Sequence, residues 1–418
     1  MTIASNGRAS LFGWWHHADR PARRALIAAS LGWMLDAFDV QLYAMVLVAL
    51  MSDLDMNMTT AGWLGSMMLI ASAVGGFANG FVADRYGRRT ALTLSILVYS
   101  VFTAACGFAQ TVTQLAFFRV LLGLGMGGEW TSGAALVSET WTGEHRGKAL
   151  GMMQSSWAVG YALAALVTAI VMPFWGWRAV FFVGVLPAFF VIWVQRRVEE
   201  PAIWREHRLA AASKPRSTFF DVFRGRLLAL TVAVTLMNAF TMFAWWGFNQ
   251  WLPAYLRLPA SRGGIGLSTY AMSGLVLAMQ VGMWFGYVTF GFIADSLGRK
   301  RTYVTFLLSA AILMLAYAGT RNPLGLLLLG PFVAFFSTGY FSGFGAVTAE
   351  IYPTAIRATS QGFTYNIGRV ASAIAPVAVG SLAEERGFGV ALSMTAVAFF
   401  AAAAAWIWIP ETRGRRLQ

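Results

Sequence analysis

Residues 80–89 read Gly-Phe-Val-Ala-Asp-Arg-Tyr-Gly-Arg-Arg, and residues 291–300 read Gly-Phe-Ile-Ala-Asp-Ser-Leu-Gly-Arg-Lys. The second stretch repeats the first at an offset of 211 residues, from 80 to 291. The same offset relates further pairs along the chain, which are Glu139 with Glu350, Arg146 with Arg357, Gly151 with Gly362 and Glu200 with Glu411. Chance does not hold one register over such a distance, so the chain contains a duplicated unit.

The duplicated unit is built from apolar segments. The chain is 58% hydrophobic and 12% charged, whereas a soluble domain carries about a quarter charged residues. A helix of roughly 20 apolar residues crosses ~30 Å of hydrocarbon, and its backbone must be bonded internally because the bilayer core holds no water. We expect spans near residues 26–51, 61–82, 90–109, 113–138, 148–172, 178–195, 227–252, 268–294, 302–320, 324–349, 358–383 and 388–409.

These spans predict an all-α membrane protein with twelve transmembrane helices in two pseudo-symmetric six-helix bundles. An even number of spans leaves both copies in the same orientation. The expected domains are residues 1–194, a cytoplasmic linker at 195–226, and residues 227–418. The polar linker is expected to carry a short amphipathic helix at the membrane interface, with a disordered tether as the alternative.

The basic residues are distributed unevenly between the two sides of the predicted membrane. The formal net charge is +13, and 24 of the 31 Lys and Arg residues fall on the side of the N-terminus, against 5 in the outer loops. This positive-inside pattern predicts cytoplasmic termini in a bacterial inner membrane. The charge therefore indicates topology and contact with anionic lipid, and not a nucleic-acid partner.

The chain has few residues for metal or covalent chemistry. Cys106 is the only cysteine, which excludes internal disulfides and thiolate clusters. The histidines show no zinc-ligand spacing and all fall in predicted cytoplasmic segments, at His16, His17, His145 and His207. We expect no metal and no cofactor apart from a proton as the coupling ion. The first apolar run is too long for a cleavable signal, so it is expected to remain as an anchor.

Ionisable side chains at membrane depth are costly and indicate function. Asp36 and Asp39 lie three residues apart on one helix face, where two carboxylates cannot both ionise cheaply, so they are predicted proton carriers. Arg369 carries a permanent charge that binds carboxylates in a bidentate manner. Spans 7 to 12 contain no acidic residue, so an incoming anion is its predicted partner; Asp36 or Asp39 across the cavity is the alternative.

Amides and aromatic rings in spans 5, 7 and 11 suit a small ligand with a planar or apolar body. Gln154 and Asn249 are the leading candidates among them. The full predicted substrate-binding set is Gln154, Trp157, Tyr161, Asn238, Trp246, Asn249, Gln250, Tyr365, Asn366 and Arg369.

Several of these stretches make the sequence similar to the major facilitator superfamily over nearly its whole length. Residues 80–89 resemble its signature G-x-x-x-D-R-x-G-R-R, and residues 119–129 resemble the span-4 motif of its proton-coupled members. Residues 410–414 resemble the end of span 12 in sugar porters. Asp36-Ala-Phe-Asp39, the Gly-Gly-Glu of span 4 and Asn366-Ile-Gly-Arg369 look most like the aromatic acid and metabolite proton symporters. The Gln-Gln pair of sugar porters is absent from span 7.

The resemblance implies a switch. Asp39 matches the span-1 aspartate of sugar porters that pairs with the span-4 arginine, here Arg119. Deprotonated Asp39 would hold Arg119, and protonation would free it, which assigns Asp36, Asp39 and Arg119 to proton coupling. The alternative is a permanent ion pair that only orients spans 1 and 4.

Charged residues at the predicted cytoplasmic ends suggest a gate that holds the halves together when the site faces outward. A role in shaping the loops alone is the alternative. The predicted gating residues are Gly80, Asp84, Arg85, Gly87, Arg88, Glu129, Glu139, Arg146, Asp295, Arg299, Glu350 and Arg357.

Together these features predict a proton-coupled symporter that imports a small organic anion, such as an aromatic acid, by rocking two bundles around one site. A neutral sugar or polyol porter and a drug:proton antiporter are the alternatives within the class. A sensor would usually carry a further soluble domain, and a membrane enzyme would want clustered His or Cys. The expected partners are the substrate and the lipid bilayer, with a monomeric chain.

Overall fold

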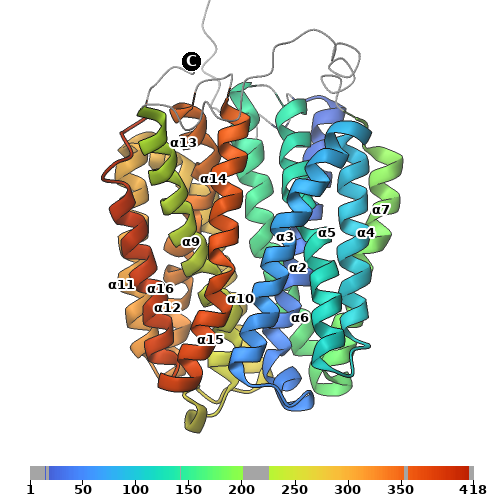
Figure 1. The fold of residues 1–418 in the computed structure, drawn as a ribbon, viewed down its shortest axis with the longest axis vertical. Helices are drawn as coiled ribbons and strands as arrows, with labels where there is room; N and C mark the ends of the chain where they lie inside the picture. Colours follow the sequence, from blue (N-terminus) through green and yellow to red (C-terminus); the bar gives the residue numbers. More distant parts are fainter. Residues whose placement is uncertain (1–14, 16–17, 142, 201–225, 353–355, 414–418) are drawn as a thin grey trace, which may run out of the picture.

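The structure of the protein is a computed structural model, and it describes residues 15, 18–141, 143–200, 226–352 and 356–413. The first half of the chain forms helices that run back and forth along one axis (Figure 1). They are α2 (Arg20–Asp53), α3 (Met58–Tyr86), α4 (Arg88–Cys106), α5 (Val112–Thr140), α6 (Gly143–Val183) and α7 (Leu186–Arg197). Residues 201–225 of the predicted linker at 195–226 lie outside the described residues, so the predicted amphipathic helix stays a prediction.

The second half repeats this arrangement. Its helices are α9 (Arg226–Arg257), η2 (Ala260–Arg262), α10 (Thr269–Leu297), α11 (Arg299–Gly319), α12 (Pro323–Thr338), η3 (Gly339–Gly343), α13 (Phe344–Ile351), α14 (Arg357–Ser372), α15 (Ile374–Arg386) and α16 (Phe388–Ala405). α12, η3 and α13 together correspond to predicted span 10, and α14 with α15 to span 11.

Ten segments of the described chain are long and apolar enough to cross a membrane. One of them, His145–Arg197, has 53 residues. Gly176 interrupts it with φ 74° and ψ −179°, a conformation that glycine adopts without strain, so the chain turns back and crosses twice. α5, with 29 residues, supplies the remaining crossing beside α3 and α4. The predicted twelve spans are confirmed, and α2 begins six residues before its predicted start, at Arg20.

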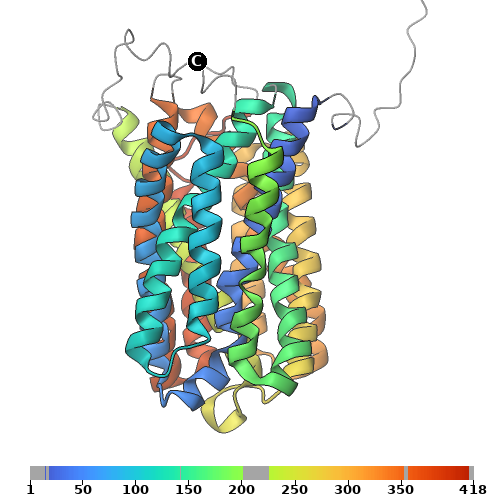
Figure 2. The ribbon, with the colours of Figure 1, turned by 90° about the vertical axis from the view of Figure 1, so that its right-hand side faces the viewer.

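The bundle has two ends, which differ in the connections they carry. The linker face is the end where α7 finishes at Arg197 and α9 starts at Arg226, and the distal face is the opposite end (Figure 2). Many large apolar side chains point outward between these faces, for example Phe77, Phe117 and Ile312, which are 60–63% exposed. Such a surface suits lipid contact, as expected of an integral membrane protein.

The internal repeat extends to individual contacts at the linker face. Arg88 pairs with Glu139 at 2.9 Å, and Arg299, 211 residues later, pairs with Glu350 at 3.0 Å. Glu200 accepts hydrogen bonds from the first backbone N–H groups of α4, from Arg88 at 2.8 Å and Arg89 at 3.0 Å. These contacts tie the α4 N-terminus to the chain beyond α7.

Glu411 does the same for α11, accepting from the backbone N–H groups of Arg299 and Lys300 at 2.8 and 3.1 Å. Partial burial acts to raise the pKa of Glu411, but the backbone N–H groups that point at it lower the pKa overall. The carboxylate thus remains a charged cap at the helix N-terminus, where the helix dipole favours a negative charge. Gly87 and Gly298 precede the two capped helices with φ of 109° and 98°. A side chain at either glycine would overlap the capping glutamate.

Glycines let α3 and α5 approach closely in the first half. A Cβ atom on Gly127 would overlap the Ser72 carbonyl oxygen, and one on Gly75 would overlap the Leu124 carbonyl oxygen. Small residues at such crossings allow the backbones to touch, which is how membrane helices associate without a hydrophobic driving force.

The Gly127→Ala variant is therefore expected to lower the stability of the first half by about 1–3 kcal/mol, because the two backbones must separate. Thermal unfolding in detergent should show a lower midpoint than for the unchanged protein. Gly274→Ala in α10, where a Cβ would meet no atom within 4 Å, is the matched control and should not lower it. Equal midpoints for the two variants would contradict the close crossing.

The two halves are packed together more closely toward the distal face. α3 packs mainly on α15, the distal part of span 11, and much less on α14, its linker-side part. Toward the linker face, Cβ atoms built on Gly80, Gly151 or Gly362 would meet no atom within 4 Å. Every salt bridge between two described residues stays within one half. The bundle is therefore closed at the distal face and parted toward the linker face.

Candidate functional site

A small cavity of about 30 Å³ lies where the two halves meet. Helices of both halves contribute to it: α2, α5 and α6 from the first, and α9, α10, η3 and α14 from the second. The cavity is smaller than an organic molecule, so a ligand must part the side chains around it. They are Trp33, Met126, Gln154, Trp157, Met242, Trp245, Trp246, Tyr287, Phe341, Tyr365 and Arg369.

Arg369 is the charged residue of this lining. Its side chain is 4% exposed, and its guanidinium makes no hydrogen bond and no salt bridge to the rest of the described chain. Its Cζ atom lies 5.3 Å from the ring centroid of Tyr365, one helical turn earlier on α14. Arg369 also interacts electrostatically with Asp36 of α2, in the other half.

Aromatic rings form the rest of the wall. Trp157 lies 4.6 Å from Trp33, 5.6 Å from Trp245 and 6.3 Å from Trp246, between ring centroids. Tyr365 stacks on Trp130 of α5 at 4.5 Å, with 8° between the ring planes. Flat apolar faces beside a guanidinium suit a ligand with a planar body and an anionic group.

Three carboxyl groups lie behind the cavity wall in the first half. Asp36, Asp39 and Glu129 are at most 1% exposed. The carboxylate oxygens of Asp36 and Glu129 have no hydrogen-bond partner among the described residues, and Asp39 interacts with the Thr103 hydroxyl. Asp36 interacts electrostatically with both Asp39 and Glu129. Buried carboxyl groups without partners are costly unless they can take up a proton, so this cluster is suited to hold one.

The predicted ion pair between Asp39 and Arg119 is not formed. The Arg119 guanidinium lies 3.5 Å from the ring centroid of Tyr43, and its Nε donates to the Leu64 carbonyl oxygen at 3.2 Å. Tyr43 follows Asp39 by one turn of α2, so Arg119 sits one turn closer to the distal face than the carboxylate. The Asp39 carboxylate instead lies against Gly184, between α6 and α7. Arg119 therefore obtains its contacts from a ring face and a backbone carbonyl.

Glu129 lies nearer the linker-side end of α5, as predicted, but its surroundings are not those of a gate. Its side chain is fully buried and lies against Gly32, one turn before Asp36 on α2. Any side chain at Gly32 would overlap the Glu129 carboxylate, so the glycine makes the room for it. Glu129 belongs to the acidic cluster and makes no gate contact in this structure.

The other predicted gating residues lie at the linker face. Arg88 with Glu139, and Arg299 with Glu350 and Asp295, bind span ends within one half and do not join the halves in this conformation. Arg85 lies over the Tyr86 ring, and Arg146 is exposed. The side chains of Asp84 and Arg357 are outside the described part of the structure.

The predicted substrate-binding residues divide into two groups. Gln154, Trp157, Trp246, Tyr365 and Arg369 line the cavity. Five others do not, because they make contacts within the bundle or lie at another level; they are Tyr161, Asn238, Asn249, Gln250 and Asn366. Asn249 and Asn366, for instance, each donate to a backbone carbonyl one turn earlier on their own helix, Trp245 and Gly362, at 3.0 and 2.9 Å.

Six lining residues are not in the predicted substrate-binding set: Trp33, Met126, Met242, Trp245, Tyr287 and Phe341. The position of Trp33 could have been predicted, because it lies three residues before Asp36 and therefore shares its helix face. The others are apolar or aromatic residues in apolar spans, and the sequence does not show which residues of such a span face the opposite half.

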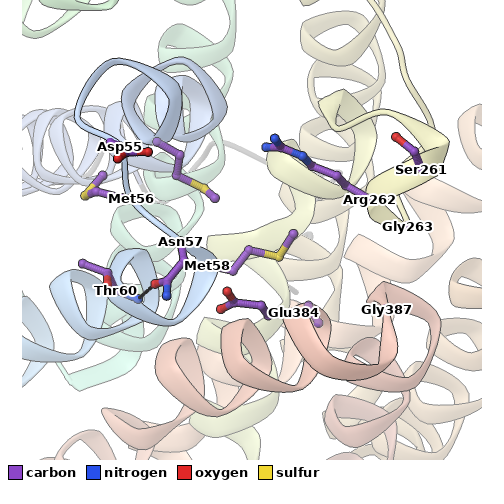
Figure 3. A pocket seen from close by; sticks show the side chains of 12 residues that line it. Asp55, Met56, Asn57, Met58, Thr60, Ser261, Arg262, Gly263, Glu384 and Gly387 are labelled. Atoms are coloured by element: carbon purple, nitrogen blue, oxygen red, sulfur yellow. Dashed lines mark hydrogen bonds between the residues drawn. The ribbon is translucent and has the colours of Figure 1, made fainter.

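The distal closure is built from cross-half contacts. Glu384 of α15 accepts from the backbone N–H of Thr59 at 3.0 Å and from its hydroxyl at 2.7 Å, at the N-terminus of α3. A Cβ on Gly62 of α3 would come within 2.6 Å of the Pro376 carbonyl oxygen. Outside this closure lies a notch of about 640 Å³, where Asp55 and Arg262 face each other across the halves (Figure 3).

We expect Gly62→Val to prevent this closure, because the added atoms meet the α15 backbone. Spin labels at Asp55 and Arg262 report the change, and electron paramagnetic resonance should show a longer distance between them. Gly151→Val is the control, since a Cβ there meets no atom within 4 Å. An unchanged distance in Gly62→Val would refute the assigned closure.

The sequence is similar to those of known proteins. The sequence matches the Major Facilitator Superfamily over residues 29–282 and 261–417. It is 33% identical over 413 residues to a probable 4-methylmuconolactone transporter of Cupriavidus pinatubonensis, covering 97% of this chain and 94% of that protein. It is 31% identical over 386 residues to the cis,cis-muconate transport protein of Acinetobacter baylyi, covering 90% and 91%.

The fold agrees with these matches. The xylose transporter XylE from E. coli, solved in a partially occluded inward open conformation, superposes with a TM-score of 0.78 at 18% identity, covering 96% of this chain and all of that one. The solved structure shows the same fold, and the sequence matches show the family: the chain belongs to the major facilitator superfamily, and it is a membrane transporter and not an enzyme.

Proposed function

We propose that this protein is a proton-coupled symporter that imports a small organic anion by alternating access. The main support for this proposal is the state of Arg369. Its guanidinium is buried in a cavity walled by tryptophan and tyrosine, and it has no hydrogen bond or salt bridge within the described chain. Guanidinium binds a carboxylate through two parallel hydrogen bonds, and a neutral sugar offers no charge to satisfy it. The names of the two relatives, a muconolactone and a muconate transporter, support an organic acid.

The proposed coupling depends on Asp36, which interacts electrostatically with Arg369. Ionised Asp36 and a substrate carboxylate both draw on the positive charge of Arg369, so each weakens the attraction of Arg369 for the other. Protonation of Asp36 leaves Arg369 to the anion, and anion binding in turn favours protonation. Proton and substrate therefore bind together. Asp39 and Glu129, which interact with Asp36, hold or pass on the proton within the same cluster.

The orientation in a bacterial inner membrane is inferred from charge. The linker face carries the greater part of the Lys and Arg residues, which predicts that it is cytoplasmic. The conformation described above, closed at the distal face and parted toward the linker face, then corresponds to an inward-facing state. Return to the outward-facing state requires the contacts of Thr59 with Glu384 to break.

Uptake into proteoliposomes tests the proposal. With an imposed proton gradient, acidic outside, the protein should accumulate labelled benzoate above its external concentration, and a protonophore should abolish this accumulation. Liposomes without protein correct for passive entry of the neutral acid. Accumulation that ignores the gradient would refute symport, and gradient-driven uptake of xylose in place of benzoate would favour the sugar alternative.

A further inference from the structure

The buried charges of the described chain are few. Five charged side chains are less than 9% exposed: the acids Asp36, Asp39 and Glu129, and the cations Arg119 and Arg369. Arg119 is held away from the cavity, over Tyr43 and at the Leu64 carbonyl oxygen. Arg369 is therefore the cation that an anionic ligand in the cavity can reach.

One guanidinium matches one carboxylate. A second carboxylate on the same small ligand would lie in a wall of tryptophan, tyrosine, phenylalanine and methionine, where an unpaired charge is costly. The buried carboxyl group that interacts with Arg369 is Asp36, which also interacts with Glu129. A second negative charge would thus be desolvated without a partner and repelled by any ionised member of this cluster.

The neutral polar groups of the lining are of a different kind. Trp130 Nε1 donates to Gln154 Oε1 at 3.3 Å, and the Tyr287 hydroxyl also interacts with Gln154. These groups suit a hydroxyl, an ester or an amide on the ligand. They do not supply the charge that a carboxylate needs.

We propose that the site selects monocarboxylates with a planar body and discriminates against dicarboxylates. This selectivity rests on the proposed function, and it separates this chain from its relative named for muconate, which is itself a dicarboxylate. The specificity determinant is the number of cations at the cavity, a property of Arg369 and of the neutral residue at position 154.

A matched set of probes tests the selectivity on the purified full-length protein. The probes are benzoate, terephthalate, which has a second carboxylate in the para position, and monomethyl terephthalate, which has the same shape with that carboxylate esterified. Quenching of tryptophan fluorescence gives their dissociation constants. We expect the dissociation constant of the monomethyl ester to be lower than that of terephthalate by about tenfold or more. Terephthalate binding as tightly as its monomethyl ester would overturn the selectivity and leave organic anion transport intact.

A variant with a second cation in the lining tests the same selectivity from the protein's side. Gln154→Arg adds a second guanidinium to the lining and should raise the affinity for terephthalate relative to the monomethyl ester by about tenfold. Gln154→Met removes the same side-chain amide without adding charge, so any loss of binding should fall on the monomethyl ester and the affinity for terephthalate itself should not rise. An unchanged ratio in a monodisperse Gln154→Arg protein would also overturn the selectivity. Failure of all three probes to bind the unchanged protein would instead contradict the proposed function.

Discussion

Replacing Arg369 by glutamine is expected to reduce the rate of organic anion uptake by about 100-fold or more. The change removes the cation of the cavity lining, and with it two charge-assisted hydrogen bonds to the substrate. Losing one partner of a buried, hydrogen-bonded charge pair costs about 3 kcal/mol, which corresponds to about 100-fold in affinity. Initial rates of labelled benzoate uptake into proteoliposomes measure the effect.

Two further variants identify the cause of the loss. Arg369→Lys keeps the charge but not the planar fork, so it should retain a part of the uptake at a higher substrate concentration. Arg386→Gln removes an exposed arginine at the distal end of the same span and should leave uptake unchanged. If Arg369→Gln transported benzoate at the original rate, the anion site would have to lie elsewhere.

Asp36→Asn is expected to abolish accumulation driven by the proton gradient while exchange persists. The amide cannot ionise, so it no longer competes for Arg369 and no longer carries a proton through the cycle. The substrate should then bind, and move in either direction down its own gradient. Counterflow exchange, with unlabelled benzoate inside and labelled benzoate outside, measures this retained activity.

The same variant distinguishes coupling from damage to the fold. Loss of both accumulation and counterflow would indicate a structural defect, which a lowered midpoint of thermal unfolding would reveal. Full accumulation in a stable Asp36→Asn protein would remove Asp36 from the coupling mechanism and leave the neighbouring Asp39 and Glu129 as the remaining acids of the cluster.

The fold could be predicted because its two main signals, apolar runs and an internal repeat, can be read along the sequence without knowing which residues are in contact. Apolar runs predicted the spans, and the offset between residues 80 and 291 predicted two equivalent halves. The same offset appears in the structure as equivalent contacts, Arg88 with Glu139 and Arg299 with Glu350. Helix length and hydropathy need no knowledge of neighbours, so they are readable without a structure.

The site could be predicted only in part. Arg369, Gln154 and Trp157 stood out as polar or aromatic residues within apolar spans, and they do line the cavity. Whether an amide faces a ligand or a carbonyl of its own helix depends on helix rotation, which is why Asn249 was misplaced. The burial of Glu129 against α2 depends on the absence of a side chain at Gly32, which the sequence around Glu129 does not reveal.

The absence of the Asp39–Arg119 pair in this structure changes where the coupling is expected. A pairing carried over from similar proteins connected two residues of the first half. The electrostatic interaction of Asp36 with Arg369 instead relates the acidic cluster of the first half to the second half. In the proposed mechanism, this charge interaction between the two halves is what lets the proton influence substrate binding.

The most direct test of this account is the number of protons taken up when substrate binds. Calorimetric titration of the purified protein with benzoate, in buffers of different ionisation enthalpy, gives this number for the unchanged protein and for Asp36→Asn. We predict net proton uptake on binding in the unchanged protein, at a pH where Asp36 is partly ionised, and much less in Asp36→Asn with benzoate still bound. Equal proton uptake in the two proteins, or none in either, would contradict the claim that Asp36 and the substrate share Arg369.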